Sequence, residues 1–525
     1  MILVGVALVR VRLLDLPLDR DEGEYAYFGQ LLLRGIPPYA AAYNFKMPGI
    51  YAVYAAILAA FGQTPTAVHI GLLLANAIAI VLIFLVGRRF IGTLGGVVAA
   101  AAYATLTLSP RLLSSAAYAE HFVVVPVLLG VLALTRADGR PQPAALVGAG
   151  VLFGTAFLVK QSGGVFALFG LVCALTGTPG DMRRRLGSAV ALAAGAAAPY
   201  AALCLLLLVA GTFGSFWFWT FTYAYHYGTG ESLRQGATNL WAALSLILPT
   251  CYLAVALSAL GLSAVVWDPA TRARFKPIGL LLLCGVVATS AGLYFRHQYF
   301  ILLLPAVALL AGLAVEAVAR RPALQATPAL RAAVAIVLAA VPLLHLVYLE
   351  RGILFVGTTR QVGRALYGMN PFPEAIEIGK YLKQRTAADD RIAVVGSEPE
   401  IYFYAERRGA TGYVYTYPMM DPQPYAVSMQ HEMIREIEAG DPRFVVFVRF
   451  WYSWLPRPES DQTIFRWFEE YKQRFERVGV VDILSPFQTR YLWGEAAAAY
   501  TPVTDRWIAV YERRGGPAAN ERTRP

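Results

Sequence analysis

Long apolar blocks alternate with short polar connections over the first 350 residues of the chain. Most blocks are about 17–25 residues long, the length an α-helix needs to cross a bilayer. Strands of a membrane barrel would instead alternate apolar and polar residues over about ten positions, and these blocks do not. The pattern predicts a polytopic α-helical membrane protein with eleven spans, at 1–14, 63–86, 93–108, 118–135, 144–159, 163–178, 186–210, 240–267, 277–294, 299–319 and 329–349.

The connections on alternate sides of these spans differ in their basic residues. One side carries clusters, namely Arg88 and Arg89, Arg136 and Arg140, Arg183 to Arg185, Arg272, Arg274 and Lys276, and Arg320, Arg321 and Arg331. The other side carries scattered single bases. By the positive-inside rule the clustered side faces the cytoplasm. The prediction therefore places residues 15–62, 109–117, 211–239 and everything after 350 outside the cytoplasm.

From about residue 370 the composition changes to short β-rich runs that alternate with amphipathic stretches. The runs lie at 391–396, 412–417, 443–450, 477–484 and 506–513, and the helical stretches at 373–386, 424–440 and 460–475. This alternation predicts a small α/β domain with a largely parallel sheet. The chain thus divides into a membrane domain at 1–350, an extracytoplasmic α/β domain at 351–515 and a disordered tail at 516–525.

The composition agrees with this class, because 57% of the 525 residues are apolar and only 15% are charged. The net charge of +11 resides largely in short loops, and no basic run has interleaved aromatic residues, so nucleic acid is not an expected partner. The four cysteines all lie inside apolar blocks, which is typical of small core residues rather than of disulfides or metal ligands.

The candidate chemistry begins in the first loop, residues 15–62. Four carboxylates crowd there at the membrane surface, Asp19, Asp21, Glu22 and Glu24. The amphipathic segment 49–61 is too short to span and is predicted to lie along the interface. Lys46 stands just before this segment, at headgroup depth, where its ammonium can meet a phosphate.

Other connections on the same side add ionisable residues. Glu120 and His121 begin the span at 118–135, Lys160 ends a helix, and Arg296 and His297 precede another span. Charged groups at membrane depth are costly, so they point to function by default. Acids from two loops and bases from three others on one face suit an anionic lipid substrate.

Several of these residues also have a purely structural interpretation. For Lys160, snorkelling at a helix end competes equally with a phosphate contact. For His121, interfacial hydrogen bonding is favoured over catalysis, and the aromatic cluster at 216–227 is more typical of an interfacial belt than of a sugar platform. Arg10 and Arg12 lie inside the first span, which is short. A start site placed too late or a truncated sequence would explain its length, and alternatively these arginines snorkel toward the outer headgroups.

The motifs resemble a known family at this point. The run Asp21-Glu22-Gly23-Glu24-Tyr25-Ala26, then Arg34-Gly35 and Phe45-Lys46-x-Pro48-Gly49, is similar to the first-loop signature of GT-C glycosyltransferases. The similar branch is that of protein O-mannosyltransferases and the lipid A aminoarabinose transferase. The resemblance continues through Glu120, the segment 157–161 and Arg296-His297-Gln298-Tyr299, over roughly the first 320 residues. Met47 departs from it by replacing a proline.

The resemblance implies a multi-pass enzyme of a bacterial inner membrane. Its donor would be a sugar on a polyprenyl phosphate, its acceptor a protein, a lipid or a glycan, and transfer from a β-linked donor would invert the anomeric carbon. Asp21 would act as catalytic base, with Glu22 beside it. Glu120 would orient the acceptor, or share a divalent metal cation with Asp21, and metal use varies among relatives.

The remaining candidates follow from the same resemblance. For the carrier phosphate they are Lys46, Arg296, His297, Lys160 and Arg12, and for the acceptor or sugar they are Glu24, Tyr25, His121 and Tyr299. Two other functions stay open, a transporter or flippase of a lipid-linked or anionic substrate and a non-catalytic membrane scaffold. A transporter is expected to carry charges near mid-membrane or paired broken spans, whereas these charges cluster at one surface.

Overall fold

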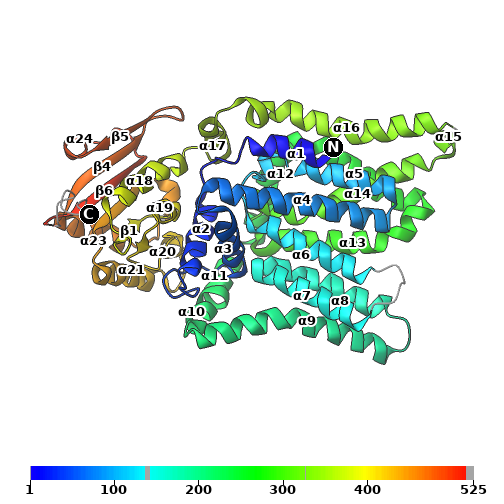
Figure 1. The fold of residues 1–525 in the computed structure, drawn as a ribbon, viewed down its shortest axis with the longest axis horizontal. Coiled ribbons are helices and arrows are strands. Elements are labelled where there is room, and N and C mark those ends of the chain that lie inside the picture. The colour runs from blue at the N-terminus through cyan, green and yellow to red at the C-terminus, as the bar shows by residue number, and fades with distance from the viewer. Residues whose placement is uncertain (1, 136–141, 326, 516–525) are drawn as a thin grey trace.

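The computed structural model describes residues 2–135, 142–325 and 327–515. A bundle of long helices forms one part of the molecule and an α/β domain forms the other, at opposite ends of the longest axis (Figure 1). The predicted tail at 516–525 lies outside the described residues, as do Arg136 and Arg140.

Each of the eleven predicted spans contains a helix in the described structure. They are α1 (Ile2–Val11), α4 (Pro65–Phe90), α5 (Thr93–Leu106), α6 (Ala119–Leu134), α7 (Pro143–Val159), α8 (Phe166–Gly177), α9 (Met182–Val209), α12 (Leu233–Trp267), α13 (Pro269–Ser290), α14 (Leu304–Ala319) and α16 (Pro328–Arg351). Within the described ranges, five apolar helices are long enough by themselves to cross a membrane. The others have 10–17 residues, so the number eleven stays a prediction.

Local sequence signals explain where individual helices begin. In α4, the Thr64 side chain accepts a hydrogen bond from the Ala67 amide at 3.2 Å, and Pro65 occupies the first turn, where its missing N–H costs nothing. In α9, Asp181 caps the Arg184 amide in the same way. The bundle helices are therefore delimited by their own sequence.

The first loop forms two further helices, α2 (Arg20–Leu33) and α3 (Gly49–Phe61), which run across the end of the bundle (Figure 1). A capping box starts α2, since Asp19 accepts from the Glu22 amide and Glu22 accepts from the Asp19 amide. Gly23 lets α2 approach the α/β domain, because a Cβ there would lie 2.5 Å from Cβ of Glu400. The first loop is thus fixed between the two parts of the molecule.

The α/β domain has a six-stranded sheet in the order β2-β1-β3-β6-β4-β5. The strands are β1 (Arg391–Val395), β2 (Arg408–Gly409), β3 (Phe444–Arg449), β4 (Phe475–Ile483), β5 (Thr489–Trp493) and β6 (Trp507–Arg513). Only β2, β1 and β3 are parallel, and the other pairings are antiparallel. The predicted largely parallel sheet is therefore wrong. The connection 484–488 is too short for the crossover that a parallel pair needs, so β4 and β5 form a hairpin.

Helices flank this sheet or lie between it and the bundle (Figure 1). They are α17 (Thr359–Tyr367), α18 (Phe372–Arg385), α19 (Glu400–Ala405), α20 (Tyr417–Met420), α21 (Ala426–Gly440), α22 (Trp451–Trp454), α23 (Thr463–Tyr471) and α24 (Glu495–Ala499). The predicted helices at 373–386, 424–440 and 460–475 are confirmed as α18, α21 and α23. The segment predicted as a strand at 412–417 is instead irregular, and Tyr413 makes an isolated bridge with Tyr43 of the first loop.

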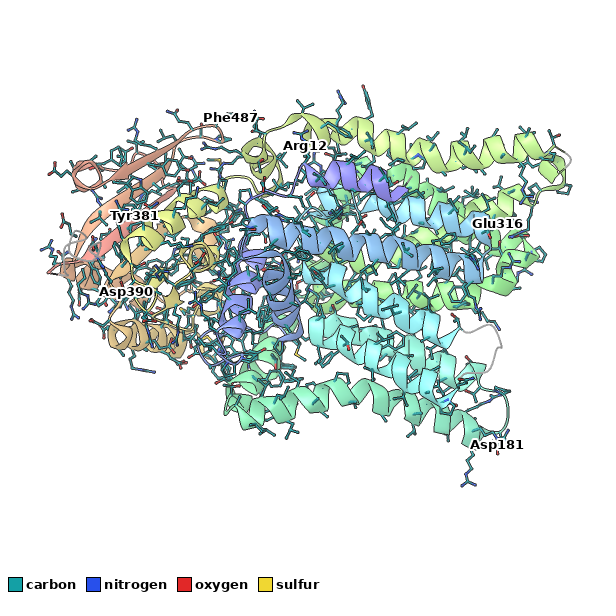
Figure 2. All side chains as sticks on the ribbon, viewed as in Figure 1. Arg12, Asp181, Glu316, Tyr381, Asp390 and Phe487 are labelled. Atoms are coloured by element: carbon teal, nitrogen blue, oxygen red, sulfur yellow. The ribbon has the colours of Figure 1, made fainter. Side chains whose placement is uncertain are left out.

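The two ends of the bundle differ as the loop charges predict. Figure 2 shows Asp181 and Glu316 at the end far from the α/β domain, whose residues include Tyr381 and Asp390. At that far end Arg320 pairs with Asp268 at 2.6 Å. The clustered basic loops and the α/β domain thus lie at opposite ends, and the end that faces the cytoplasm remains a prediction.

Candidate active site

A cavity of about 1200 Å³ lies where the bundle meets the α/β domain. Its walls come from the first loop, from the ends and connections of the bundle helices and from the domain. Of the twelve residues predicted to have a catalytic, carrier-binding or acceptor-binding role, seven line it: Asp21, Tyr25, Lys46, Lys160, Arg296, His297 and Tyr299. The fold therefore gathers residues from four separate segments of the chain at one site.

Asp21 stands in the first turn of α2 with one carboxylate oxygen anchored. Lys46 Nζ donates to its Oδ1 at 2.7 Å, and the Tyr415 hydroxyl shares its proton between this oxygen at 3.2 Å and the Arg20 carbonyl oxygen at 2.9 Å. Among the described residues, none hydrogen-bonds Oδ2. The side chain is 30% exposed, so the second oxygen can receive a proton from a molecule in the cavity.

The cations around Asp21 favour its ionised form. Burial by itself raises the pKa of the carboxyl, but the charges of Lys46, Arg296 and Lys160 outweigh burial and hold the pKa below its ordinary value of 3.8. The same cations form a positive region where an anionic phosphate can bind.

Lys46 is shared between two carboxylates. Its ammonium lies 2.5 Å from Glu24 Oε2, while the Tyr51 hydroxyl donates to Glu24 Oε1 at 2.8 Å. Burial raises the pKa of Glu24 in spite of the lysine. Glu24 is fully buried and does not line the cavity. Glu24 therefore does not make the predicted contact with acceptor or sugar, and its carboxylate positions Lys46 instead.

Lys160 and Glu120 form a second ion pair. Lys160 Nζ lies 2.9 Å from Glu120 Oε1 and 4.4 Å from the centre of the Tyr299 ring. Glu120 is 1% exposed and does not line the cavity, so it positions Lys160 and reaches the site only through that residue. The expected contact between Glu120 and an acceptor is not found.

Asp21 and Glu120 are the two residues for which the sequence left a shared divalent metal cation open. Each carboxylate already pairs with a lysine ammonium, Asp21 with Lys46 at 2.7 Å and Glu120 with Lys160 at 2.9 Å. Within the described residues no group of three or more His, Cys, Asp or Glu side chains could hold a metal ion. The residues present do not fit a divalent cation, and no catalytic step is assigned to one.

A strained turn places Arg296 on the cavity wall. Leu293 and Phe295 have φ of 60° and 45°, a conformation that costs a non-glycine residue about 1–3 kcal/mol and often occurs at functional sites. The guanidinium lies 5.7 Å from the centre of the Tyr294 ring. His297 also lines the cavity, but burial lowers its pKa, and so do the charges of Arg111 and Arg296. A neutral His297 is a weaker phosphate ligand than Arg296.

Three sequence predictions fail because the side chains do not reach the cavity. Glu22 is buried, and its Oε1 accepts from the Ala117 amide at 2.6 Å and contacts His69 Nε2 at 3.1 Å, so it joins the first loop to the second. Arg12 donates to the Gly357 carbonyl oxygen at the surface. His121 is buried within α6. None of the three lines the cavity. Glu22 therefore has no catalytic contact there, Arg12 no contact with a carrier phosphate, and His121 no contact with a sugar or acceptor.

Arg10 does not snorkel, which was one of the two alternatives for this residue. Its guanidinium is buried and donates to the carbonyl oxygens of Thr107 and Ser114, at 2.6 and 3.1 Å. The side chain therefore fixes the 109–117 connection, whereas snorkelling would have carried it to the lipid headgroups.

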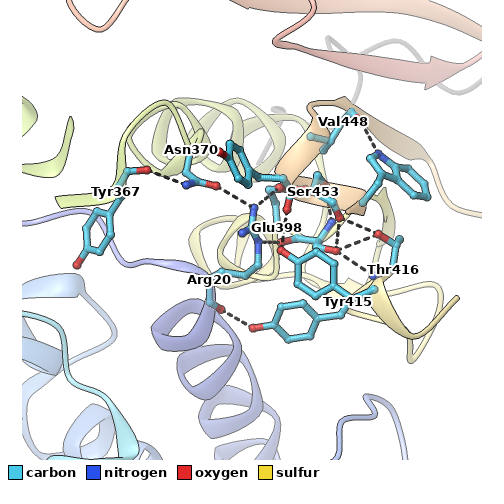
Figure 3. A network of polar contacts seen from close by, with 12 residues as sticks. Arg20, Tyr367, Asn370, Glu398, Tyr415, Thr416, Val448 and Ser453 are labelled. Atoms are coloured by element: carbon cyan, nitrogen blue, oxygen red, sulfur yellow. Dashed lines mark hydrogen bonds and ion pairs between the residues drawn. The ribbon is translucent and has the colours of Figure 1, made fainter. Parts of the chain in front are cut away.

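The α/β domain contributes residues that no sequence motif identified. Figure 3 shows the network in which Arg20, next to Asp21 in the chain, clamps this domain. The guanidinium donates to the Ser397 carbonyl oxygen, to Asn370 Oδ1 at 3.3 Å and to Glu398 Oε1 at 2.9 Å. Glu398 is fully buried and also accepts from the Ser453 hydroxyl at 2.7 Å. The clamp holds Tyr415 against Asp21.

We expect Arg20→Gln to loosen the domain. Glu398 would lose its only cationic partner among the described residues, and a buried charge stripped of its partner costs about 3–5 kcal/mol. Hydrogen exchange of the α2 amides and of residues 397–404 should become faster. Arg34→Gln is the matched control, because Arg34 also contacts this domain, through the Glu406 carbonyl oxygen, but is exposed. Equal exchange in both variants would contradict the clamp.

The bundle, the crossing helices of the first loop and the attached α/β domain constitute the GT-C fold. The structure of ArnT from Cupriavidus metallidurans bound to undecaprenyl phosphate is similar over 98% of both chains, with a TM-score of 0.58 and 16% identity. Its apo structure gives a TM-score of 0.57. The predicted fold class, a polytopic GT-C membrane protein with a terminal α/β domain, is confirmed.

Two further comparisons agree with this fold. Residues 45–209 match the family of dolichyl-phosphate-mannose-protein mannosyltransferases. The oligosaccharyltransferase AglB from Archaeoglobus fulgidus, in complex with an inhibitory peptide and a dolichol-phosphate, is similar over 94% of this chain and 74% of its own, with a TM-score of 0.52 and 13% identity. No curated protein sequence matches the chain.

Proposed function

We propose that the protein transfers a sugar from a polyprenyl-phosphate carrier to an acceptor at the extracytoplasmic face of a bacterial inner membrane. One observation carries this proposal. The carboxylate of Asp21, whose Oδ2 has no hydrogen bond from the described residues, lies beside Lys46, Arg296 and Lys160 in a cavity at the end of a membrane helix bundle. A base and a phosphate site are thus adjacent, as displacement of a lipid phosphate requires. The matched family and the carriers bound to ArnT and AglB support the same chemistry.

The reaction uses the two kinds of group together. The acceptor hydroxyl gives its proton to Asp21 Oδ2 as its oxygen attacks the anomeric carbon. The bond from that carbon to the phosphate oxygen breaks, and the carrier phosphate leaves with the bonding electrons. Arg296, Lys46 and Lys160 stabilise the growing negative charge. A single displacement inverts the anomeric carbon.

Lys46 can bind the phosphate without leaving the carboxylates. A lysine ammonium has three N–H donors, and two of them are used by Asp21 and Glu24. The third donor is left for a phosphate oxygen. This sharing places the leaving group within reach of the base.

The transporter alternative is less consistent with the structure. The ionisable side chains of the cavity lie at the domain end of the bundle, beside the crossing helices α2 and α3. A transporter site is expected near mid-membrane, between repeated halves. The scaffold alternative leaves the strained Arg296 turn and the cation cluster without a role.

Mass analysis of the purified protein tests the proposal. We expect polyprenyl phosphate to co-purify with the wild-type protein and to fall by about tenfold or more in Arg296→Met, because a charge-assisted phosphate contact is lost. Surface glycans of cells with and without the gene should differ by one sugar addition. Carrier recovered in equal amounts from both proteins, or identical glycans, would contradict the proposal.

A further inference from the structure

The two halves of the cavity have different chemistry. The bundle half carries the cations Lys160 and Arg296. Among its described lining residues, the α/β domain supplies one cation, Arg457, whose Nε lies 3.5 Å from Asp421 Oδ1. Most of the other lining residues of that half are aromatic, proline or acidic, among them Tyr367, Phe372, Tyr415, Tyr417, Trp451, Pro456, Pro458 and Glu459. A phosphate is attracted to the first half and repelled by the carboxylates of the second.

A row of aromatic side chains leads outward from Asp21 along the domain half. The Tyr415 ring stacks on that of Tyr417, with centres 5.5 Å apart and planes at 30°. The Tyr417 hydroxyl donates to the Tyr452 carbonyl oxygen at 2.8 Å, and the Tyr452 and Trp451 rings lie 5.0 Å apart. Trp451 is 57% exposed although it lines the cavity. Burying a tryptophan is strongly favourable, so this exposed ring is suited to a ligand.

We propose that this aromatic row is the acceptor subsite, and that the acceptor is a carbohydrate. The inference rests on the proposed glycosyl transfer. In an in-line displacement the acceptor lies opposite the leaving phosphate. The cations that bind the phosphate come from the bundle and the first loop, so the acceptor lies on the domain side.

The chemistry of the row suits a sugar better than a peptide. A sugar ring presents C–H groups that pack flat on the exposed face of Trp451. Its hydroxyls can donate to the carboxylates of Asp421 and Glu459 and accept from Arg457, all of which line the cavity. A neutral ligand rich in hydroxyls also avoids the repulsion that these acids would exert on a second phosphate.

The test uses the full-length protein in nanodiscs and a single substitution, Trp451→Ala. The probes are an array of bacterial envelope oligosaccharides and an array of serine- and threonine-containing peptides. We expect the wild-type protein to bind oligosaccharides and the variant to bind them about tenfold less, the loss of one aromatic stacking contact. Phe487→Ala is the matched control, because Phe487 is exposed on the same domain but does not line the cavity. This control should bind like the wild-type protein.

The outcomes separate the subsite from the proposed function. Binding to peptides alone, or equal oligosaccharide binding by wild type and Trp451→Ala, would overturn the carbohydrate subsite. Brominated lipids quench tryptophan fluorescence. If part of this quenching is lost in Trp451→Phe, the Trp451 ring lies among headgroups, and the carbohydrate subsite would also be overturned. Polyprenyl phosphate in each preparation reports on the glycosyltransferase itself. If the wild-type protein retains no carrier, the proposed function fails whatever the arrays show.

Discussion

Asp21→Asn is expected to abolish sugar transfer, lowering kcat by about 10²–10⁴-fold, the range for loss of a general base. The amide keeps the shape of the carboxylate and can still accept from Tyr415, but it cannot take the acceptor proton. Carrier binding should persist, because Lys46, Arg296 and Lys160 remain. The measurement is the transfer rate at saturating donor, together with the polyprenyl phosphate content of the purified protein.

Asp15→Asn is a suitable control for this prediction. Asp15 belongs to the same loop and accepts from the Thr66 hydroxyl, but it does not line the cavity. It should keep wild-type activity. Full activity of Asp21→Asn would remove Asp21 from the mechanism.

Lys46→Met is expected to have the second largest effect, on both carrier binding and stability. The fully buried Glu24 would lose its cationic partner, and Asp21 would lose the lysine that anchors it. Breaking a buried ion pair in this way costs about 3–5 kcal/mol. The melting temperature in nanodiscs and the retained polyprenyl phosphate should therefore both fall. A double variant, Lys46→Met with Glu24→Gln, should recover stability but not carrier.

The pH profile provides an independent test of the lysine. The cations hold the pKa of Asp21 below 3.8, so the base stays ionised, and activity is lost only as the pH falls through that lowered value. Lys46→Met removes the largest of these attractions, so the pKa of Asp21 should rise and the acidic limb of kcat should move to higher pH. An unchanged acidic limb would show that Lys46 does not act on the base.

The bundle could be predicted from the sequence because the bilayer leaves the chain little choice. A backbone in lipid must satisfy its N–H and C=O groups internally, so each apolar block becomes a helix. Alternation across the membrane then brings Asp21, Lys46, Lys160 and Arg296 to one end, as predicted. These conclusions depend on the order and spacing of residues alone.

The sequence could not show which carboxylates of the first loop point into the cavity. Asp21 and Glu22 are adjacent, but successive residues of an α-helix point about 100° apart. The packing of α2 turns Asp21 into the cavity and Glu22 toward Ala117. Likewise Glu120 and Glu24 are turned to hold lysines. Only the positions of neighbouring elements select which acid faces a substrate.

The contribution of the α/β domain was decided entirely by tertiary structure. The β-rich pattern at 412–417 predicted a strand, yet this segment docks on Tyr43 and presents Tyr415 to Asp21. The order and direction of the strands could not be predicted from the sequence either, because sheet pairing joins residues distant in the chain. The sequence by itself determined the membrane helices and the end at which charges gather, since both follow from local hydrophobicity. Contacts across almost four hundred residues built the cavity, since only packing can place Tyr415 beside a carboxylate in α2.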